Sequence, residues 1–370
     1  MKNKTLFLTL KIFSATGGIE KVCRIAGKAL NEINLQGGGR TKIFCMHDRQ
    51  KDAAGNTYFP DELFTGFGAA KIKFVRKAVA EGRKTDIVML SHINLLLVGW
   101  LIKLLNPKVK LILLAHGIEV WEPLNSIKKS MLNKCDLILA VSRFTKEKMI
   151  GLHGLERKKL KVFNNCLDPN LTEIINKEKD RDLLDRYGFT KDNIILFTLT
   201  RLATSERYKG YEKVIEAMKL LVTSYPELRY LLAGKYDTLE RLRIEELIKE
   251  NKLEAYIVLA GFIQEAEVAA HFNLANIYIM PSVKEGFGIV FIEAMHYGKP
   301  VIAGNKDGSV DALANGEFGL LVDPDDINAI TEAIKKMLQN PQQFIPDQKK
   351  LEEKFGYSRY KEGLRGVVES

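Results

Sequence analysis

Short apolar runs alternate with longer segments of helical periodicity along the whole chain. In the first half the runs cover residues 5–10, 41–45, 87–91, 110–115 and 137–141, and in the second half 194–200, 229–233, 257–260, 277–280 and 301–303. Runs of this length, separated by helical patterns, predict parallel β-strands joined by helices. The pattern therefore predicts an α/β protein built from two doubly wound, Rossmann-like sheets.

A polar, highly charged stretch near the middle separates the two series of strands. With 370 residues the chain is long for one core. We expect an N-terminal domain over residues 1–170, a linker and connecting helix over 171–190, and a second domain over 191–350. The tail, residues 351–370, reads as a helix that packs back on the N-terminal domain. Such sheets bind ligands at the carboxyl ends of their strands, so we expect a ligand cleft there.

Cysteine usage and hydropathy favour a cytoplasmic protein. Four cysteines lie far apart without a CxxC pair, which indicates reduced thiols rather than a zinc site or a disulfide framework. Residues 5–10 read as a first strand, because the apolar run is too short for a signal peptide. The most apolar stretch, residues 93–105, contains Lys103 and is shorter than the roughly 20 residues that span a bilayer.

Positive charge is concentrated in the first half of the chain. Residues 1–170 hold 29 Lys and Arg against 14 Asp and Glu, a balance of +15, whereas residues 171–370 balance at −5. A solvated basic surface and a docking surface for an anionic partner both fit this charge. The chain has no nucleic-acid-binding motif, so we expect no nucleic acid and favour an anionic membrane surface, with the protein peripheral on its inner face.

One basic segment has a second interpretation. Residues 64–84 combine phenylalanines and aliphatic residues with six cations, as in a helix that lies on a membrane. The same composition fits an ordinary amphipathic helix that packs on the sheet and leaves its basic side in water.

A glycine-flanked turn holds two carboxylates eight positions apart. Glu285 precedes Gly286 and Gly288, and Glu293 lies on the predicted helix 289–297. A glycine-rich entry to a helix offers free backbone N–H groups and the positive end of the helix dipole. A phosphate can therefore rest between the two acids, which would contact sugar and ribose hydroxyls.

The pattern Glu285-x7-Glu293 resembles the signature of retaining glycosyltransferases of family four, which have the GT-B fold. Further motifs of that family match in order and spacing, and the resemblance covers nearly the whole chain. They lie at residues 16–21, 116–119, 141–145, 164–165, 200–202, 209–210 and 319–324. The resemblance implies two Rossmann-like domains that face each other across a cleft, and a reaction that requires no metal and no cofactor.

Site residues follow from chemistry and from the resemblance. Arg201 and Lys209 come after the strand 194–200, where a guanidinium and an ammonium suit a diphosphate, although two solvated cations are the alternative. The resemblance implies that Glu285 contacts the donor sugar, that Glu293 contacts the ribose and that His116 faces the sugar. We expect catalytic roles for His116, Glu285, Arg201 and Lys209. The expected donor-binding residues are Gly17, Gly18, Ile263, Gly286, Phe287, Gly288, Ile289, Val290 and Glu293.

For each of three further groups of acids, the sequence allows two interpretations. Glu119 is either a partner of the acceptor or a charge at a helix start. Asp311 either replaces a glutamate that many relatives carry or has no part in the site. The acids of residues 323–326 suggest a metal site, but we favour a cap for the helix 327–338.

These residues predict a retaining transfer of a hexose from a nucleoside-diphosphate sugar to a hydroxyl of a glycan or lipid-linked acceptor. The expected donor is UDP-glucose, then GDP-mannose, in polysaccharide or glycolipid synthesis. Two other functions stay open. A nucleotide-sugar epimerase of GT-B-like fold would convert the sugar without an acceptor, and a non-catalytic module would bind the nucleotide only.

Overall fold

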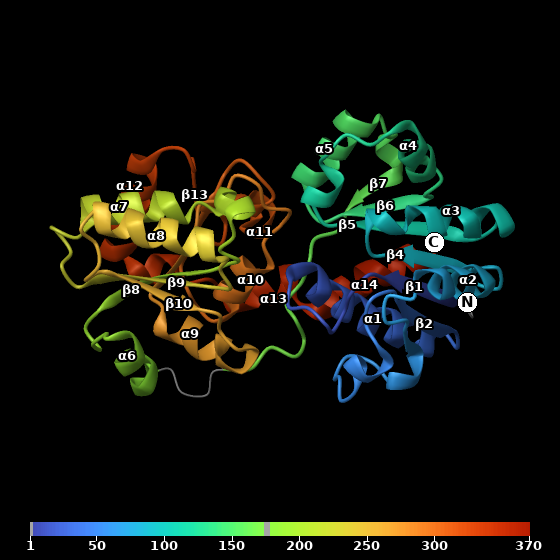
Figure 1. The fold of residues 1–370 in the computed structure, drawn as a ribbon, viewed down its shortest axis with the longest axis horizontal. Helices are drawn as coiled ribbons and strands as arrows, with labels where there is room; N and C mark the ends of the chain where they lie inside the picture. Colours follow the sequence, from blue (N-terminus) through green and yellow to red (C-terminus); the bar gives the residue numbers. More distant parts are fainter. Residues whose placement is uncertain (1–2, 174–177) are drawn as a thin grey trace. The chain divides into compact units, whose positions relative to one another are not determined.

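The computed structural model describes residues 3–173 and 178–370. Its chain divides into two units, one of Met1–Asn170 with Phe355–Ser370 and one of Leu171–Lys354 (Figure 1). Each unit is a parallel sheet covered by helices. The predicted α/β class with two Rossmann-like sheets is confirmed.

In the described part of the first unit the sheet has seven parallel strands in the order β3-β2-β1-β4-β5-β6-β7. The strands are β1 (Lys4–Thr9), β2 (Arg40–Cys45), β3 (Phe64–Gly66), β4 (Ile87–Leu90), β5 (Lys110–Ala115), β6 (Leu137–Ala140) and β7 (Leu160–Val162). The central strands are nearly continuous apolar runs, because helices bury both faces of the sheet.

Helices cover the two faces of this sheet unequally. They are α1 (Gly18–Gln36), α2 (Lys71–Gly82), α3 (Leu96–Leu105), α4 (Ser126–Asn133), α5 (Arg143–His153) and α14 (Tyr357–Val368). Side chains of α2, α3, α4 and α5 share one hydrophobic core, and side chains of α1 and α14 share the other. The C-terminal helix α14 is held by buried Leu364 and by an ion pair of 2.8 Å between Lys361 and Glu32 of α1.

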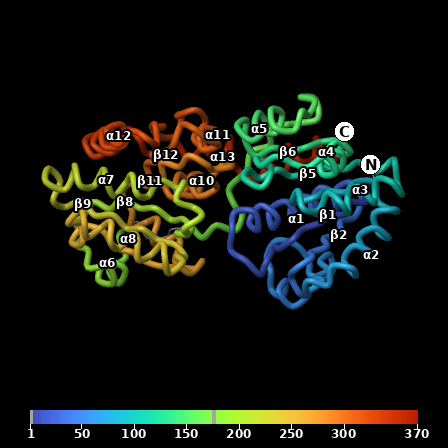
Figure 2. The backbone as a smooth tube through the Cα atoms, turned by 45° about the horizontal axis from the view of Figure 1, so that its top comes forward, coloured from blue at the N-terminus to red at the C-terminus, as the bar shows by residue number. Residues whose placement is uncertain are grey.

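In the described part of the second unit six parallel strands lie in the order β10-β9-β8-β11-β12-β13. The strands are β8 (Ile194–Leu199), β9 (Leu228–Ala233), β10 (Ile257–Gly261), β11 (Ile277–Met280), β12 (Val301–Gly304) and β13 (Leu320–Val322). The helices are α6 (Arg181–Tyr187), α7 (Tyr211–Leu221), α8 (Thr238–Glu250), α9 (Val268–Leu274), α10 (Ile289–His296), α11 (Ser309–Ala312), α12 (Ile327–Gln339) and α13 (Gln348–Phe355). Helices α7 and α12 pack against each other over one face, as Figures 1 and 2 show.

Residues 171–190, which we expected to form a linker and a connecting helix, are included in the second unit. Residues 174–177 of this stretch lie outside the described residues. The stretch contains α6, which packs against α9.

All ten strands predicted from the sequence are present, with bounds that agree within two residues. The strands that the pattern missed are β3, β7 and β13. Each has three residues and lies at an edge of its sheet. A run of three residues is too short to show an apolar period, so these edges depend on neighbouring strands for their pairing.

The basic segment 64–84 follows its second interpretation in part. It divides into β3 and the helix α2, and Phe64, Phe67 and Phe74 are buried in the cores of the first unit. The phenylalanines are therefore used for packing, while Ile72 and the cations of α2 remain exposed.

Two smaller expectations are also settled. Asp326 caps α12, because its carboxylate accepts a hydrogen bond of 3.1 Å from the backbone N–H of Ala329. All four cysteines are buried and free of disulfides, as expected. Among the described residues, no helix has both the length and the apolar character needed to cross a membrane.

Candidate active site at the carboxyl ends of the second sheet

The turn between β11 and α10 depends on two glycines that other residues could not replace without strain. Gly288, the residue before α10, has φ of 83°, a left-handed conformation that other residues rarely adopt. A Cβ on Gly308, in the loop after β12, would overlap the carbonyl oxygen of Gly286. The loop after β12 therefore lies directly against the turn that carries Glu285.

Asp307 ties these two loops together. Its Oδ2 accepts hydrogen bonds of 2.7 Å from the hydroxyl of Ser282 and from the backbone N–H of Glu285, and its Oδ1 accepts one of 2.9 Å from the N–H of Ser309. The N–H of Gly308 donates to the carbonyl of Glu285 at 2.8 Å. Burial raises the pKa of Asp307 to about 6, against the effect of these hydrogen bonds. Asp307 thus fixes the backbone position from which the Glu285 side chain extends.

Glu285 and Lys209, both predicted as site residues, form an ion pair. Lys209 Nζ lies 2.5 Å from Glu285 Oε2, and the two side chains are only 13% and 17% exposed. Burial lowers the pKa of Lys209, but the Glu285 carboxylate outweighs this effect and raises the pKa overall. The structure therefore brings together a cation and an acid that lie 76 positions apart in the sequence.

Arg201 lies after β8 in a more open environment. Its side chain is 64% exposed, and its Nη1 lies 2.9 Å from Glu206 Oε1. Both predicted phosphate-binding cations therefore have a carboxylate partner in this structure.

A buried carboxylate that sequence reasoning missed anchors the segment between Arg201 and α7. Glu240 of α8 is fully buried and accepts hydrogen bonds from Arg207 at 2.9 Å, from Tyr211 at 2.6 Å and from Arg243. Burial opposes its ionisation, but these hydrogen bonds lower the pKa of Glu240 overall. The network fixes the short helical segment Thr204–Lys209, which ends at the lysine of the site.

The remaining predicted donor-binding residues of the second unit are largely buried. Glu293 is 5% exposed on α10, and Ile263 is 6% exposed after β10. Phe262, next to Ile263, is 52% exposed and offers a free ring face at the carboxyl end of its strand. The other members share the start of α10, where all but the half-buried Val290 are buried: Gly286, Phe287, Gly288, Ile289 and Val290.

In the first unit, His116 follows β5 as predicted, and its environment defines its protonation. Its ring Nε2 lies 2.8 Å from the backbone carbonyl oxygen of Ser91, which can only accept, so Nε2 carries the proton. Burial lowers the pKa of His116 to about 4. Its Nδ1 has no hydrogen-bond partner among the described residues. His116 is therefore a neutral ring whose acceptor nitrogen is buried without a partner among the described residues.

Glu119 has a local partner. Its Oε1 accepts a hydrogen bond of 2.6 Å from the backbone N–H of His116, and burial raises the pKa of Glu119. Glu119 thus fixes the backbone of the residue that precedes Gly117, whose φ is 140°.

The loop with Gly17 and Gly18 is held by a second acid that the sequence did not reveal. Asp48, which is buried, accepts hydrogen bonds of 2.8 Å from the backbone N–H groups of Ile12 and Phe13, and one from the hydroxyl of Ser14. Gly17 precedes α1 and Gly18 begins it. The loop therefore keeps a defined shape at the carboxyl end of β1.

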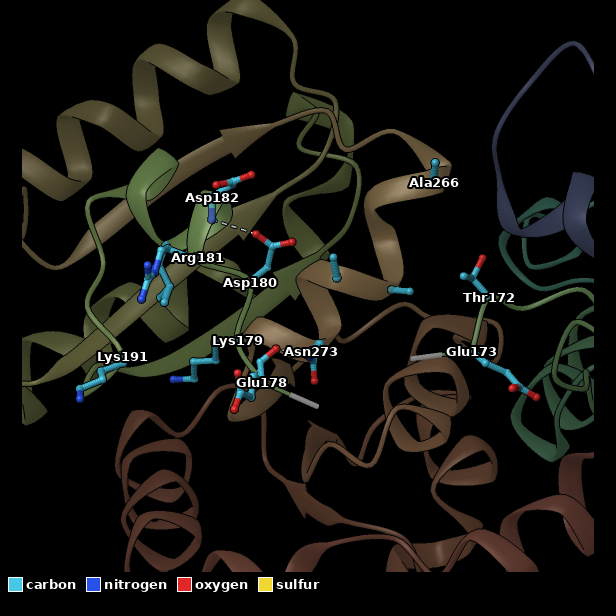
Figure 3. Close-up of a pocket in the computed structure, with 13 residues that line it drawn as sticks. Thr172, Glu173, Glu178, Lys179, Asp180, Arg181, Asp182, Lys191, Ala266 and Asn273 are labelled. Carbon is cyan, nitrogen blue, oxygen red and sulfur yellow. Dashed lines mark hydrogen bonds between the residues drawn. The ribbon is translucent and has the colours of Figure 1, made fainter. Parts of the chain in front are cut away.

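A separate pocket of about 1020 Å³ lies in the second unit (Figure 3). Its lining includes charged side chains around α6, among them Lys179, Asp180 and Arg181. Lys191 and Asn273 of the lining come shortly before β8 and β11, which places the pocket at the amino ends of the strands. Doubly wound sheets bind ligands at the opposite edge, and no predicted site residue lines this pocket. We therefore assign the candidate site to the carboxyl ends.

Among residues 3–173 and 178–370, no group of three or more His, Cys, Asp or Glu side chains is arranged to hold a metal ion. Asp323 and Asp325 instead lie 2.6 and 2.8 Å from Lys306.

The chain matches two protein families along most of its length. Residues 16–171 match Glycosyltransferase Family 4, and residues 180–361 match Glycosyl transferases group 1. The two ranges correspond closely to the two structural units.

The chain is also similar to enzymes from other organisms. One is the GDP-mannose-dependent alpha-(1-6)-phosphatidylinositol monomannoside mannosyltransferase of Mycolicibacterium smegmatis, 27% identical over 61% of this chain and 60% of that protein. Another is the alpha-monoglucosyldiacylglycerol synthase of Acholeplasma laidlawii, 24% identical over 58% of this chain and 52% of that protein. The chain thus matches between half and three-fifths of the length of these relatives.

The fold has a solved counterpart. The structure of Anabaena Alr3699/HepE in complex with UDP and glucose has a TM-score of 0.80, with 20% identity over 99% of both chains. At this identity the similarity establishes the GT-B fold.

The protonation of His116 predicts how the stability of the protein changes with pH. The neutral ring has a pKa of about 4 in the folded protein and about 6.5 when unfolded. Between these values the unfolded chain binds the extra proton, so acid favours unfolding. We expect the stability of the wild type relative to His116→Asn to fall by about 1.4 kcal/mol per pH unit from pH 6.5 to 4. Urea unfolding curves of both proteins would measure it, and a constant difference would contradict the buried neutral ring.

For Asp307 we expect stability to change with pH in the opposite direction. Its pKa is about 6 when folded and 3.8 when unfolded, so the folded state binds the extra proton between these values. The stability of the wild type relative to Asp307→Asn should fall by about 1.4 kcal/mol per pH unit as the pH rises from 4 to 6. The same unfolding measurements test this, and an advantage that grows with pH would show that the carboxylate is not buried as described.

Proposed function

The chain belongs to family four of the glycosyltransferases, and from this premise we propose a retaining hexosyl transfer. The donor is a nucleoside-diphosphate sugar, UDP-glucose first and GDP-mannose next. The acceptor is a hydroxyl of a glycan or a lipid-linked sugar in polysaccharide or glycolipid synthesis. The observation that carries the proposal is the largely buried Lys209–Glu285 pair at the glycine turn before α10.

The pair combines both chemistries that the donor requires. A carboxylate accepts hydrogen bonds from sugar hydroxyls, and an ammonium beside it stabilises the negative charge of a leaving diphosphate. The free N–H groups at the start of α10, those of Ile289 and Val290, favour a phosphate at the same place. Arg201 adds a second cation, which exchanges Glu206 for the diphosphate. Glu285 then binds the hexose and Glu293 the ribose.

The base and the sugar ring have further partners. The backbone at Ile263 reads the edge of the nucleobase, and the exposed ring of Phe262 supplies a stacking face. In the first unit, the free Nδ1 of His116 accepts a hydrogen bond from a sugar hydroxyl. In the first unit, the loop with Gly17 and Gly18 offers the donor a backbone without side chains.

The reaction proceeds on one face of the sugar. The bond between the anomeric carbon and the diphosphate oxygen breaks, and a bond from that carbon to the acceptor oxygen forms. The acceptor proton moves to the departing phosphate oxygen, so no enzymic nucleophile and no metal take part. Asp311 has no role in this scheme.

The first unit serves the acceptor. Its balance of +15 suits an anionic membrane surface, and the protein is then a peripheral protein of the inner face. A relative that is named a synthase of alpha-monoglucosyldiacylglycerol supports a lipid-linked acceptor.

A donor panel tests the function. Thermal shifts with UDP-, GDP- and ADP-sugars should single out one nucleotide, and mass spectrometry of the product should show one added hexose with the donor's anomeric configuration. EDTA should leave the rate unchanged. Isomerised donor without acceptor would instead indicate an epimerase, and a thermal shift without turnover a binding module.

Variants of the ion pair separate catalysis from folding. Lys209→Met or Glu285→Gln leaves one buried charge without its partner, so each single variant should lose stability as well as activity. The double variant should recover most of the stability but keep a loss of kcat/KM of about 100-fold or more.

A matched pair in the first unit provides the control. Lys361→Met with Glu32→Gln removes an ion pair of 2.8 Å and should leave the rate unchanged. Near-normal turnover in the Lys209 and Glu285 double variant would exclude this site.

A further inference from the structure

The outward face of α3 is apolar. Leu97, Trp100, Leu101 and Leu104 recur at the spacing of one helix face, and Leu97 and Leu104 are 49% and 55% exposed. The opposite face packs into the core through residues such as Ile102, which is fully buried. Trp100 and Leu101 of the outward face are half-buried. The helix is therefore hydrophobic on both sides, although one side faces solvent.

A helix on the surface of a sheet normally presents polar residues to water. A contiguous exposed apolar patch usually marks a binding surface, because its exposure gives no advantage to the folded protein. The face of α3 thus requires a partner that covers it.

The helices on either side of α3 also expose apolar side chains. Helix α3 packs between α2 and α4 on one face of the first sheet (Figure 1). Ile72 of α2 is 78% exposed and Ile127 of α4 is 68% exposed. We call this set the α3 surface, and its members are Ile72, Leu97, Trp100, Leu101, Leu104, Leu105 and Ile127. In the described part of the first unit, Leu35 alone among the strongly exposed large hydrophobic residues lies elsewhere.

Cations border the α3 surface. Helix α2 and the two residues after it expose six of them, and none forms an ion pair with another described residue: Lys71, Lys73, Arg76, Lys77, Arg83 and Lys84. Lys128 of α4 is also exposed. The three helices contain one acid, Glu81, which pairs with Lys42 at 2.8 Å. The field around the apolar patch is therefore positive.

We propose that the α3 surface docks the protein on an anionic lipid bilayer. The leucines and Trp100 enter the boundary between headgroups and acyl chains, while the cations of α2 lie over lipid phosphates. This combination of an apolar face, an aromatic ring and a basic border matches the chemistry of a bilayer surface. The proposal rests on the membrane-linked acceptor proposed above. It assigns the apolar contact to α3 and leaves the electrostatic contact to α2, because the phenylalanines of residues 64–84 are buried.

Vesicle binding of the full chain tests the proposal. The wild type should co-sediment with vesicles of phosphatidylcholine that contain 30% phosphatidylglycerol, and more weakly with phosphatidylcholine alone. Leu97→Gln with Leu104→Gln should lower the partition coefficient by about tenfold or more, because two leucine side chains no longer enter the bilayer. The matched control is Leu239→Gln with Leu242→Gln, two leucines of α8 that are 72% and 58% exposed. This control should bind as the wild type does.

Charge variants test the other half of the surface. Lys73→Gln with Lys77→Gln should lower binding to the anionic vesicles by about tenfold at low salt and have little effect on binding to phosphatidylcholine. The corresponding control, Lys219→Gln with Lys249→Gln, removes two exposed lysines of the second unit and should not change binding.

The outcomes separate this proposal from the proposed function. Transfer to a water-soluble acceptor should be the same in wild type and α3 variants, so loss of vesicle binding with intact transfer supports the docking role. Unchanged vesicle binding in the α3 double variant would overturn it. So would a wild-type dimer that dissociates in that variant without a change in vesicle binding, since the patch would then join two copies of the chain. Absence of transfer in every protein, with vesicle binding as expected, would refute only the proposed function.

Discussion

The candidate site depends on one partly buried ion pair, that of Lys209 with Glu285. Two charges at 13% and 17% exposure are stable only when each compensates the desolvation of the other. The requirement for close contact constrains two loops at once, the one after β8 and the one after β11. The rest of the second unit serves to hold these two loops in register.

That register comes from buried acids that do not belong to the predicted motif. Asp307 ties the turn of Glu285 to the loop after β12, and Glu240 ties the segment before α7 to α8. Glycines add to this effect where backbone meets backbone, as Gly308 does against Gly286. The position of each site residue is therefore set by neighbours that are themselves buried, which limits how far the turn can move.

In the first unit, other acids fix the backbone of the candidate site residues. Asp48 satisfies the N–H groups of the loop after β1, and Glu119 satisfies the N–H of His116. The Ser91 carbonyl then fixes the His116 tautomer and leaves one ring nitrogen free. On another face of the same unit, α3 combines a packed side with an exposed apolar side. The hydrogen-bonded polar groups and the exposed apolar side of α3 thus lie on different parts of this unit.

The sequence by itself determined the class of fold and the ten longer strands, and it singled out the residues of the candidate site. Strands buried on both faces must be continuous apolar runs, and the glycine turn with its two glutamates carries a recognisable pattern. It also predicted a helix cap among the acids of residues 323–326, since capping is a local interaction, and the structure identifies Asp326 as that cap. The short edge strands β3, β7 and β13 were not predicted, because they show no periodic pattern and depend on pairing with a neighbouring strand.

Only the tertiary structure decided which groups meet. Asp307, Glu240 and Asp48 could not be identified in advance, since an acid that accepts hydrogen bonds from distant backbone looks like any other acid in a sequence. The ion pair of Lys209 with Glu285 was also not evident from the sequence, because the two residues lie 76 positions apart. The apolar stretch of α3 was visible in the sequence, but its exposure was not. Exposure depends on which side of a helix the neighbouring helices leave uncovered, and that is a property of packing in three dimensions.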